Sequence, residues 1–210
     1  PMRHGLTLGE AALWYRDHKK MKINLQVVGM NGYRPKDLPH YGWPVVPWVN
    51  PSPNIPRVSC TRIYPGTVLI EGTNISEGRG TTVPLEIFGL PGIDMHKVLK
   101  EMSTMAPQWL EGCVVRTAYY EPTFHKFKGE LVSALQVHVD GPFYNPNVFR
   151  PYRLVNLFFK AVHRVKPDFE IWRKPPYEYE EKHMPIDILS GHSLLRDWVA
   201  TAKPEIKEWD

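Results

Sequence analysis

Apolar residues recur at helical spacing in four stretches of the chain. The strongest begins at Pro151, whose fixed φ suits a first helical turn, and its apolar positions fall on one face: Leu154, Leu157, Phe158, Ala161, Val162 and Val165. Weaker patterns predict helices over residues 8–19, 94–105 and 193–200. Thr7 and Glu10 form a T-x-x-E capping box at the start of the first of these, and Asp94 is a suitable N-cap for the second.

Four other stretches predict β-strands. Apolar residues alternate over residues 23–28, and residues 64–71 are predicted to form a buried strand that ends in a polar turn over residues 72–82. Strands are also predicted over residues 113–120 and 131–139. Helices and strands are interspersed without a βαβ repeat, so we predict an α+β fold in which helices pack on a mixed β-sheet.

Proline sets the character of the loops. The 210 residues include 21 prolines, and residues 33–56 are so rich in them that this segment is neither a helix nor a central strand. We therefore expect long, ordered, proline-rich loops. A loop of this length is uncommon without a role, so residues 33–56 are a candidate wall of a binding site.

Composition narrows the classes of partner. The net charge is only +4 and Lys and Arg form no stripe, which argues against a nucleic-acid partner. No stretch approaches the roughly 18 apolar residues of a membrane helix, so no membrane partner is expected. Cys60 and Cys113 lie far apart and form neither a zinc signature nor a disulfide framework, although one disulfide between them stays open. The 7 tryptophans and 10 tyrosines suit either a carbohydrate site or the core.

The polar turn after residue 71 is the strongest local candidate for a site. Glu77 to Thr82 reads Glu-Gly-Arg-Gly-Thr-Thr, and two glycines around an arginine let the backbone come close to a ligand. Arg79 offers a forked donor suited to a carboxylate, and Ser76 and Thr81 add neutral hydrogen bonds. The alternative is a tight turn in which Arg79 forms salt bridges with Glu77 or Glu71.

Histidines mark two further places. Arg3 and His4 lie at the amino end of the first predicted helix, where helix dipole and backbone amides favour an anion, whereas Thr7 and Glu10 are expected only to cap the helix. His125 and His138 lie at the ends of the strands predicted over residues 113–120 and 131–139, and they converge on one face if those strands pair as a hairpin. No closely spaced histidine pair or HExxH motif is present, so neither a metal nor another cofactor is expected.

Glycoside hydrolysis needs two carboxyl groups about 5 to 10 Å apart. Glu10, Glu71, Glu77 and Glu121 are candidates, but the sequence around them marks none as a proton donor. The residues by themselves therefore indicate a site for an anionic sugar or another small anion.

Several blocks in order along the chain resemble exo-β-N-acetylmuramidases, a bacterial family first described as a domain of unknown function. The matching blocks are RHGLTLGEAAL (3–13), PWVNPSPNIP (47–56), YPGTVLIEGTNISEGRGTT (64–82), EPTFHKFKGE (121–130), LQVHV (135–139), FRPYR (149–153), PPYEYE (175–180) and MPIDILSG (184–191). The resemblance implies removal of N-acetylmuramic acid from the non-reducing end of peptidoglycan fragments. It also implies that residues 1–210 are the carboxyl-terminal domain, and that the catalytic acid lies on an absent amino-terminal Rossmann-like domain, joined in cis or binding in trans.

The resemblance also gives roles to the candidate site residues. Arg79 would bind the lactyl carboxylate of muramic acid, and Ser76, Glu77 and Thr81 would shape the loop around it. His4, Asn74 and His125 would form hydrogen bonds with the sugar hydroxyls or the acetamido group. Arg3 is also expected among the substrate-binding residues. The main alternative is a non-catalytic module or subunit that binds muropeptides or other carbohydrates. A periplasmic or exported protein is expected.

Overall fold

The computed structural model describes residues 5–32 and 47–202 and divides the chain into two compact units, Pro1–Val49 and Asn50–Asp210. In the first unit, α1 (Leu8–His18) is the helix predicted at residues 8–19. The predicted capping box is confirmed, because Glu10 N donates to Thr7 Oγ1 at 3.2 Å and Thr7 N donates to Glu10 Oε2 at 2.7 Å.

The strand predicted at residues 23–28 is wrong, because this segment is irregular. A strand needs a neighbour for its backbone hydrogen bonds, and the described residues of this unit contain no second strand. The segment instead lies close to α1, since a Cβ at Gly9 would come within 2.4 Å of Val27 Cγ1.

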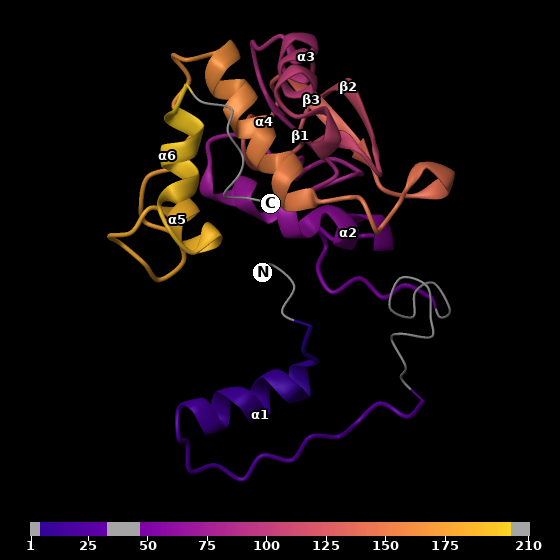
Figure 1. The fold of residues 1–210 in the computed structure, drawn as a ribbon, viewed down its shortest axis with the longest axis vertical. Helices are drawn as coiled ribbons and strands as arrows, with labels where there is room; N and C mark the ends of the chain where they lie inside the picture. The colour runs from indigo at the N-terminus through magenta and orange to yellow at the C-terminus, as the bar shows by residue number, and fades with distance from the viewer. Residues whose placement is uncertain (1–4, 33–46, 203–210) are drawn as a thin grey trace. The chain divides into compact units, whose positions relative to one another are not determined.

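The second unit confirms the α+β class (Figure 1). Its elements in chain order are α2 (Val58–Thr67), η2 (Val68–Gly72), β1 (Ile87–Leu90), α3 (Met95–Met105), η3 (Pro107–Leu110), β2 (Val114–Tyr120), β3 (Val132–His138), η4 (Gly141–Phe143), α4 (Pro151–Val165), α5 (Pro185–Ser190) and α6 (Leu194–Ala200). The helices predicted at residues 94–105, from Pro151 and at 193–200 are confirmed as α3, α4 and α6. Each described helix is too short or too polar to cross a lipid bilayer.

The sheet has the strand order β1-β3-β2, and both pairings are antiparallel. The two strands predicted at residues 113–120 and 131–139 form β2 and β3 and pair as a hairpin, with Tyr120 paired to Val132 and Val114 to His138. This register places His138 at the far end of the hairpin from the β2–β3 connection, which carries His125. The predicted convergence of these two histidines is therefore wrong, because antiparallel pairing sends the end of β3 away from the connection.

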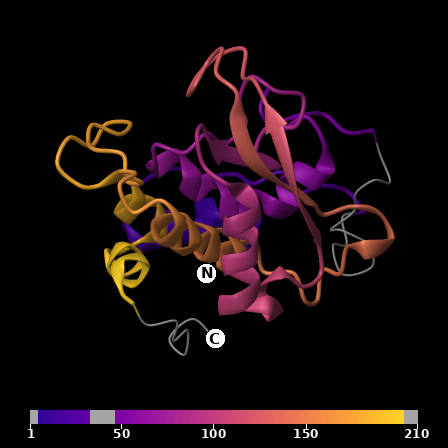
Figure 2. The ribbon, with the colours of Figure 1, turned by 90° about the horizontal axis from the view of Figure 1, so that it is seen from above.

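Helix α4 is the centre of the core. Its residues from Leu154 to Val162 are all buried, and it contacts α2, α3 and α6. Phe158 packs edge-to-face on Phe88 of the sheet, with ring centroids 4.8 Å apart. Figure 2 shows α4 beside α3, with the β2–β3 hairpin projecting past them.

The strand predicted at residues 64–71 is also wrong. These residues form the end of α2 and all but the last residue of η2. A short apolar run fits a buried helix as well as a buried strand, and here packing decides. Gly66 lies so close to the start of α4 that a Cβ there would come within 2.2 Å of Pro151 O. Helix-on-helix contact therefore sets the local structure, and η2 delivers the chain to the polar turn.

Candidate functional site

The polar turn that follows η2 is anchored on both sides by backbone pairing. Ser76 N donates to Gly89 O at 2.8 Å and Gly89 N donates to Ser76 O at 2.9 Å, which joins the turn to β1. On the other side, Asn74 N donates to Ile171 O at 2.8 Å, and the Asn74 Nδ2 donates to Glu170 O at 2.8 Å. The turn is therefore held between β1 and the segment that follows α4.

Two glycines bring this turn against the β2–β3 connection. Gly78 and Gly80 have φ of 75° and 83°, a region that L side chains rarely adopt. A Cβ at Gly80 would come within 2.7 Å of Phe124 N, so only glycine allows this approach. Thr123 N donates to Gly80 O at 3.0 Å across the contact. As a result Glu77 and Arg79 meet the connection between β2 and β3.

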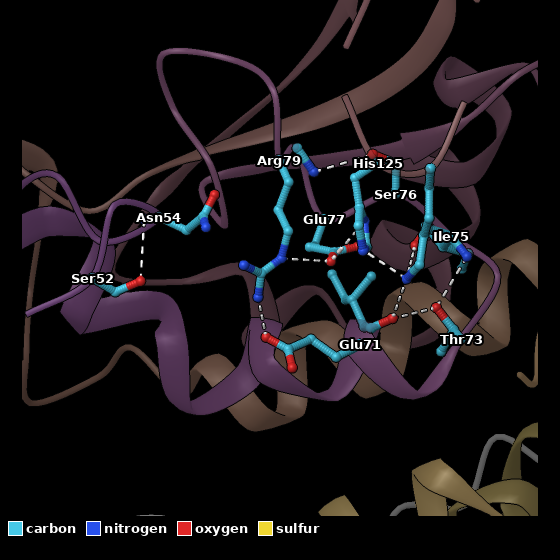
Figure 3. Close-up of polar contacts among 12 residues, drawn as sticks. Ser52, Asn54, Glu71, Thr73, Ile75, Ser76, Glu77, Arg79 and His125 are labelled. Carbon is cyan, nitrogen blue, oxygen red and sulfur yellow. Dashed lines mark hydrogen bonds and ion pairs between the residues drawn. The ribbon is translucent and has the colours of Figure 1, made fainter. Parts of the chain in front are cut away.

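Glu77 is the centre of the polar cluster formed at this contact (Figure 3). Its side chain is 1% exposed. Arg79 Nε donates to Oε1 at 2.9 Å and Lys126 Nζ donates to Oε2 at 2.9 Å. His125 Nδ1 lies 3.5 Å from Oε1. One buried carboxylate therefore holds three basic side chains from two loops.

Lys126 is fixed by three hydrogen bonds. Besides Glu77, its Nζ donates to Ile70 O at 3.1 Å and to Ile75 O at 2.9 Å. Burial lowers the pKa of Lys126, against the attraction of Glu77. Burial acts to raise the pKa of Glu77, but the favourable interactions, of which the charge and hydrogen bond of Lys126 are the largest, together outweigh it, so this pKa lies below its ordinary value. Glu77 is therefore ionised at neutral pH and is not a proton donor.

Arg79 links Glu77 to a second carboxylate. One of its terminal nitrogens donates to Glu71 Oε1 at 2.6 Å, and Tyr177 OH donates to Glu71 Oε2 at 3.3 Å. Burial, followed by the charge of Glu71, raises the pKa of Tyr177 to about 12 and also raises that of Tyr64. Both phenols therefore stay protonated beside the ion pair at neutral pH.

The structure brings together some predicted site residues and gives others a local role. Glu77, Arg79 and His125 meet in one cluster, and Arg79 forms salt bridges with both Glu77 and Glu71, as the alternative reading of this turn predicted. Ser76 and Thr81 instead hydrogen-bond within the turn, where Gly78 N donates to Ser76 Oγ at 3.2 Å and Thr81 Oγ1 donates to Gly78 O at 2.6 Å.

Asn74 stands apart from the cluster, and two further residues of the prediction cannot be compared with it. The side-chain amide of Asn74 donates to the backbone carbonyls of Glu170 and Trp172. Arg3 and His4 lie outside the described residues. The ligand-binding roles given to all of the candidate residues stay predictions.

Two members of the cluster were not among the predicted site residues. Lys126 and Tyr177 both fall in blocks that resemble the family, EPTFHKFKGE and PPYEYE, so those blocks were the available signal. No local pattern shows that they reach Glu77 and Glu71. Within residues 5–32 and 47–202, no group of three or more His, Cys, Asp or Glu side chains is arranged to hold a metal ion.

The solvent-facing part of the cluster mixes donors and acceptors. His125 is 44% exposed, Arg79 23% and Glu71 21%, whereas Glu77 lies beneath them. Arg79 also has a terminal nitrogen with no hydrogen-bond partner among the described residues. Figure 3 draws Ser52 and Asn54, from the proline-rich block, on the side of Arg79 away from Glu77. Such a surface suits a ligand that carries hydroxyl and carboxylate groups.

Two profiles of one protein family together match almost the whole chain. The family profile described as "Exo-beta-N-acetylmuramidase NamZ, C-terminal" matches residues 62–209, and the one described as "Exo-beta-N-acetylmuramidase NamZ, N-terminal" matches residues 1–59. Peptidoglycan beta-N-acetylmuramidase NamZ of Bacillus subtilis (strain 168) is 36% identical over 171 residues, which are 81% of this chain and 39% of that protein.

Two crystal structures of DUF1343 family proteins from Bacteroides fragilis NCTC 9343 share the fold. The first has a TM-score of 0.73 at 22% sequence identity, and the match covers 98% of this chain and 51% of the chain in that structure. The second has a TM-score of 0.55 at 18% sequence identity, and the match covers 93% of this chain and 47% of the chain in that structure. The chain thus spans about half the length of these structures and 39% of the curated relative. On the profile matches and the 36% identity, the chain belongs to the exo-β-N-acetylmuramidase NamZ family of bacterial cell-wall glycosidases.

Proposed function

We propose that this chain supplies substrate-binding groups to a peptidoglycan hydrolase that releases N-acetylmuramic acid from the non-reducing end of cell-wall fragments. The catalytic acid, in this proposal, lies on a Rossmann-like domain joined in cis or binding in trans. Because peptidoglycan lies outside the cytoplasmic membrane, we propose a periplasmic or exported location.

The observation that carries the proposal is the cluster around Glu77. The ionised carboxylate is buried, so the basic groups of Arg79, Lys126 and His125 are oriented before any ligand arrives. Ordering these groups in advance lowers the entropy cost of binding. Tyr177 belongs to the same cluster through its hydrogen bond to Glu71, and a tyrosine ring with a polar tip suits the mixed surface of a sugar.

Arg79 has a narrower role in this proposal than a free arginine would have. Two of its nitrogens are occupied by Glu71 and Glu77, so a lactyl carboxylate would be bound by the remaining terminal nitrogen. A single hydrogen bond between charged groups contributes about 1.5 to 3 kcal/mol. This corresponds to a change in affinity of about tenfold to a hundredfold.

A second candidate function has an observation in its favour. Glu77 is ionised and fully engaged, and this is expected of a residue that organises a binding surface rather than one that protonates a leaving group. A non-catalytic module or subunit that binds muropeptides would show the same cluster.

Binding of two sugars tests the carboxylate assignment. N-acetylmuramic acid and N-acetylglucosamine differ in the lactyl group, so Arg79→Ala should weaken binding of the first by about tenfold or more and of the second much less. Titration calorimetry on the folded 210-residue chain gives both affinities. Equal losses for the two sugars would remove Arg79 as the carboxylate ligand.

Controls separate binding from folding and from catalysis. Arg116→Ala removes an exposed arginine of β2 that contacts Gln136 and His138, and it should leave both affinities unchanged. Native mass of the expressed protein, measured together with release of a chromogenic N-acetylmuramic acid glycoside, distinguishes the two functions. Sugar release supports the hydrolase, whereas binding without release supports the module.

A further inference from the structure

The β2–β3 connection holds one imidazole in a defined orientation. We propose that Glu77 is a positioning residue. Its carboxylate keeps the Nδ1–H of His125 directed toward it, so that the Nε2 of His125 accepts a hydrogen bond from a ligand hydroxyl. This inference deepens the proposed function and rests on it, since it names the atom and the ligand group.

The geometry around the imidazole distinguishes its two nitrogens. His125 Nδ1 lies 3.5 Å from Glu77 Oε1, whereas Nε2, on the other side of the ring, has no partner among the described residues. The group that contacts one ring nitrogen decides which nitrogen carries the proton. A buried carboxylate at Nδ1 favours the Nδ1–H form and leaves a lone pair on the half-exposed Nε2.

The carboxylate cannot turn away from the imidazole. Its Oε1 also accepts from Arg79 Nε and its Oε2 from Lys126 Nζ, both at 2.9 Å. Lys126 is tied in turn to the carbonyls of Ile70 and Ile75. The Glu77 side chain is therefore a fixed acceptor, and His125 is oriented by a group that does not itself face solvent.

The backbone at His125 has a positive φ, which is uncommon for residues other than glycine. Its φ is 73° and that of Phe127 is 59°, a region in which glycine is unstrained and most other residues are not. Hydrogen bonds across the connection hold this shape, including Gly129 N to Pro122 O at 3.0 Å and Glu130 N to Phe127 O at 2.9 Å. Strained backbone of this kind collects at functional sites, where a particular side chain is needed at a particular point.

The ligand group follows from the tautomer that the neutral ring adopts. A neutral imidazole with its proton on Nδ1 offers only a lone pair at Nε2, so it binds a donor. Hydroxyl groups of a sugar are such donors, whereas a ligand carboxylate has no proton to offer at neutral pH. Within this site, His125 therefore recognises a hydroxyl, and the carboxylate of the ligand is left to Arg79.

Nitrogen-15 NMR of the histidine rings tests the positioning role without any ligand. In the 210-residue chain, the neutral ring of His125 should show a protonated Nδ1 and an unprotonated Nε2. His138 is an internal reference, because its Nε2 accepts from Arg116 Nε at 3.0 Å and its proton also belongs on Nδ1. Glu77→Gln should mix the two forms of His125 and leave His138 unchanged. A wild-type His125 that carries its proton on Nε2, or one that Glu77→Gln does not alter, would overturn the positioning role.

Two variants test the hydroxyl contact in a chain that keeps its fold. His125→Gly and His125→Asn relieve the backbone, so their urea midpoints should equal or exceed that of the wild type. Their affinity for N-acetylglucosamine, which has hydroxyls but no carboxylate, should fall at least fivefold, and His138→Asn should not change it. Unchanged affinity in both His125 variants would overturn the hydroxyl contact. A wild type that binds neither sugar would overturn the proposed function and this contact, while the ring signals would still decide the role of Glu77.

Discussion

Replacing Lys126 by methionine tests how the buried cluster contributes to stability. Methionine keeps most of the aliphatic stem but removes the ammonium, which leaves Glu77 and the carbonyls of Ile70 and Ile75 without their shared donor. Removing one partner of a buried ion pair costs about 3 to 5 kcal/mol. Arg79 Nε still donates to Glu77 at 2.9 Å, so we expect the free energy of unfolding to fall by about 3 kcal/mol, the lower end of that range.

Urea unfolding of wild type, Lys126→Met, Glu77→Gln and the double variant measures this loss and the coupling between the two residues. The double variant should lose less stability than the sum of the two single losses. The reason is that it has no Glu77 carboxylate left unpaired by the loss of the Lys126 ammonium. Lys128→Met is the matched control, since Lys128 is an exposed lysine of the same connection, and its change should stay within about 0.5 kcal/mol. A loss below about 1 kcal/mol for Lys126→Met would refute the reasoning, because surface ion pairs contribute that much.

The same pair predicts a dependence on pH. The pKa of Glu77 lies below the value of 4.5 that an unperturbed glutamate has. Burial acts to raise this pKa, but the interactions that favour the ionised form, of which those with Lys126 are the largest, together outweigh it. The folded state therefore gains stability above pH 4.5 and loses it as the pH falls through the lowered pKa. Unfolding free energies of wild type and Glu77→Gln should converge as the pH is lowered below 4.5, and a constant difference down to acid would contradict this.

Three further predictions follow from particular positions. Gly80→Ala should cost about 2 kcal/mol or more in urea unfolding, because its Cβ would come within 2.7 Å of a backbone amide, whereas Gly141→Ala, with a similar positive φ but open space, should cost less. Asp94→Ala should cost about 1 kcal/mol, because the carboxylate accepts two amide hydrogen bonds at the start of α3, and a loss of helical circular dichroism on mild heating would show it first. Burial raises the pKa of Cys60 and of Cys113 from 9.0 to about 12, so the free energy of unfolding should fall as the pH rises above 9. Cys60→Ala should make that fall shallower. An unchanged slope of the unfolding free energy against pH would show that the Cys60 thiol is not buried.

The sequence predicted those elements whose signals are local. The capping box of Thr7 and Glu10 marked the start of α1, Asp94 marked α3, and the apolar face after Pro151 marked α4. Each of these signals lies within one or two turns of the residues that it orders. The two strands of the β2–β3 hairpin were predicted as well, although their pairing was left open.

The sequence also indicated where the site lies, although not how it is built. The Glu-Gly-Arg-Gly turn and His125 were singled out, and both belong to the cluster. The same residues left open whether Arg79 binds a ligand or forms salt bridges within the protein. The structure shows the salt bridges, and the ligand role stays a proposal.

Only the tertiary structure decided what depends on distant contacts. Residues 64–71 became helix rather than strand because they pack against α4, and residues 23–28 have no strand to pair with in the described part of their unit. Lys126 reaches Glu77 across 49 residues of chain and Tyr177 reaches Glu71 across 106. No periodicity encodes such pairs, because they depend on which loops the sheet and the helices bring together. The local sequence therefore fixes helix ends and turns, while packing around α4 and the docking of the glycine turn on the β2–β3 connection create the charged cluster.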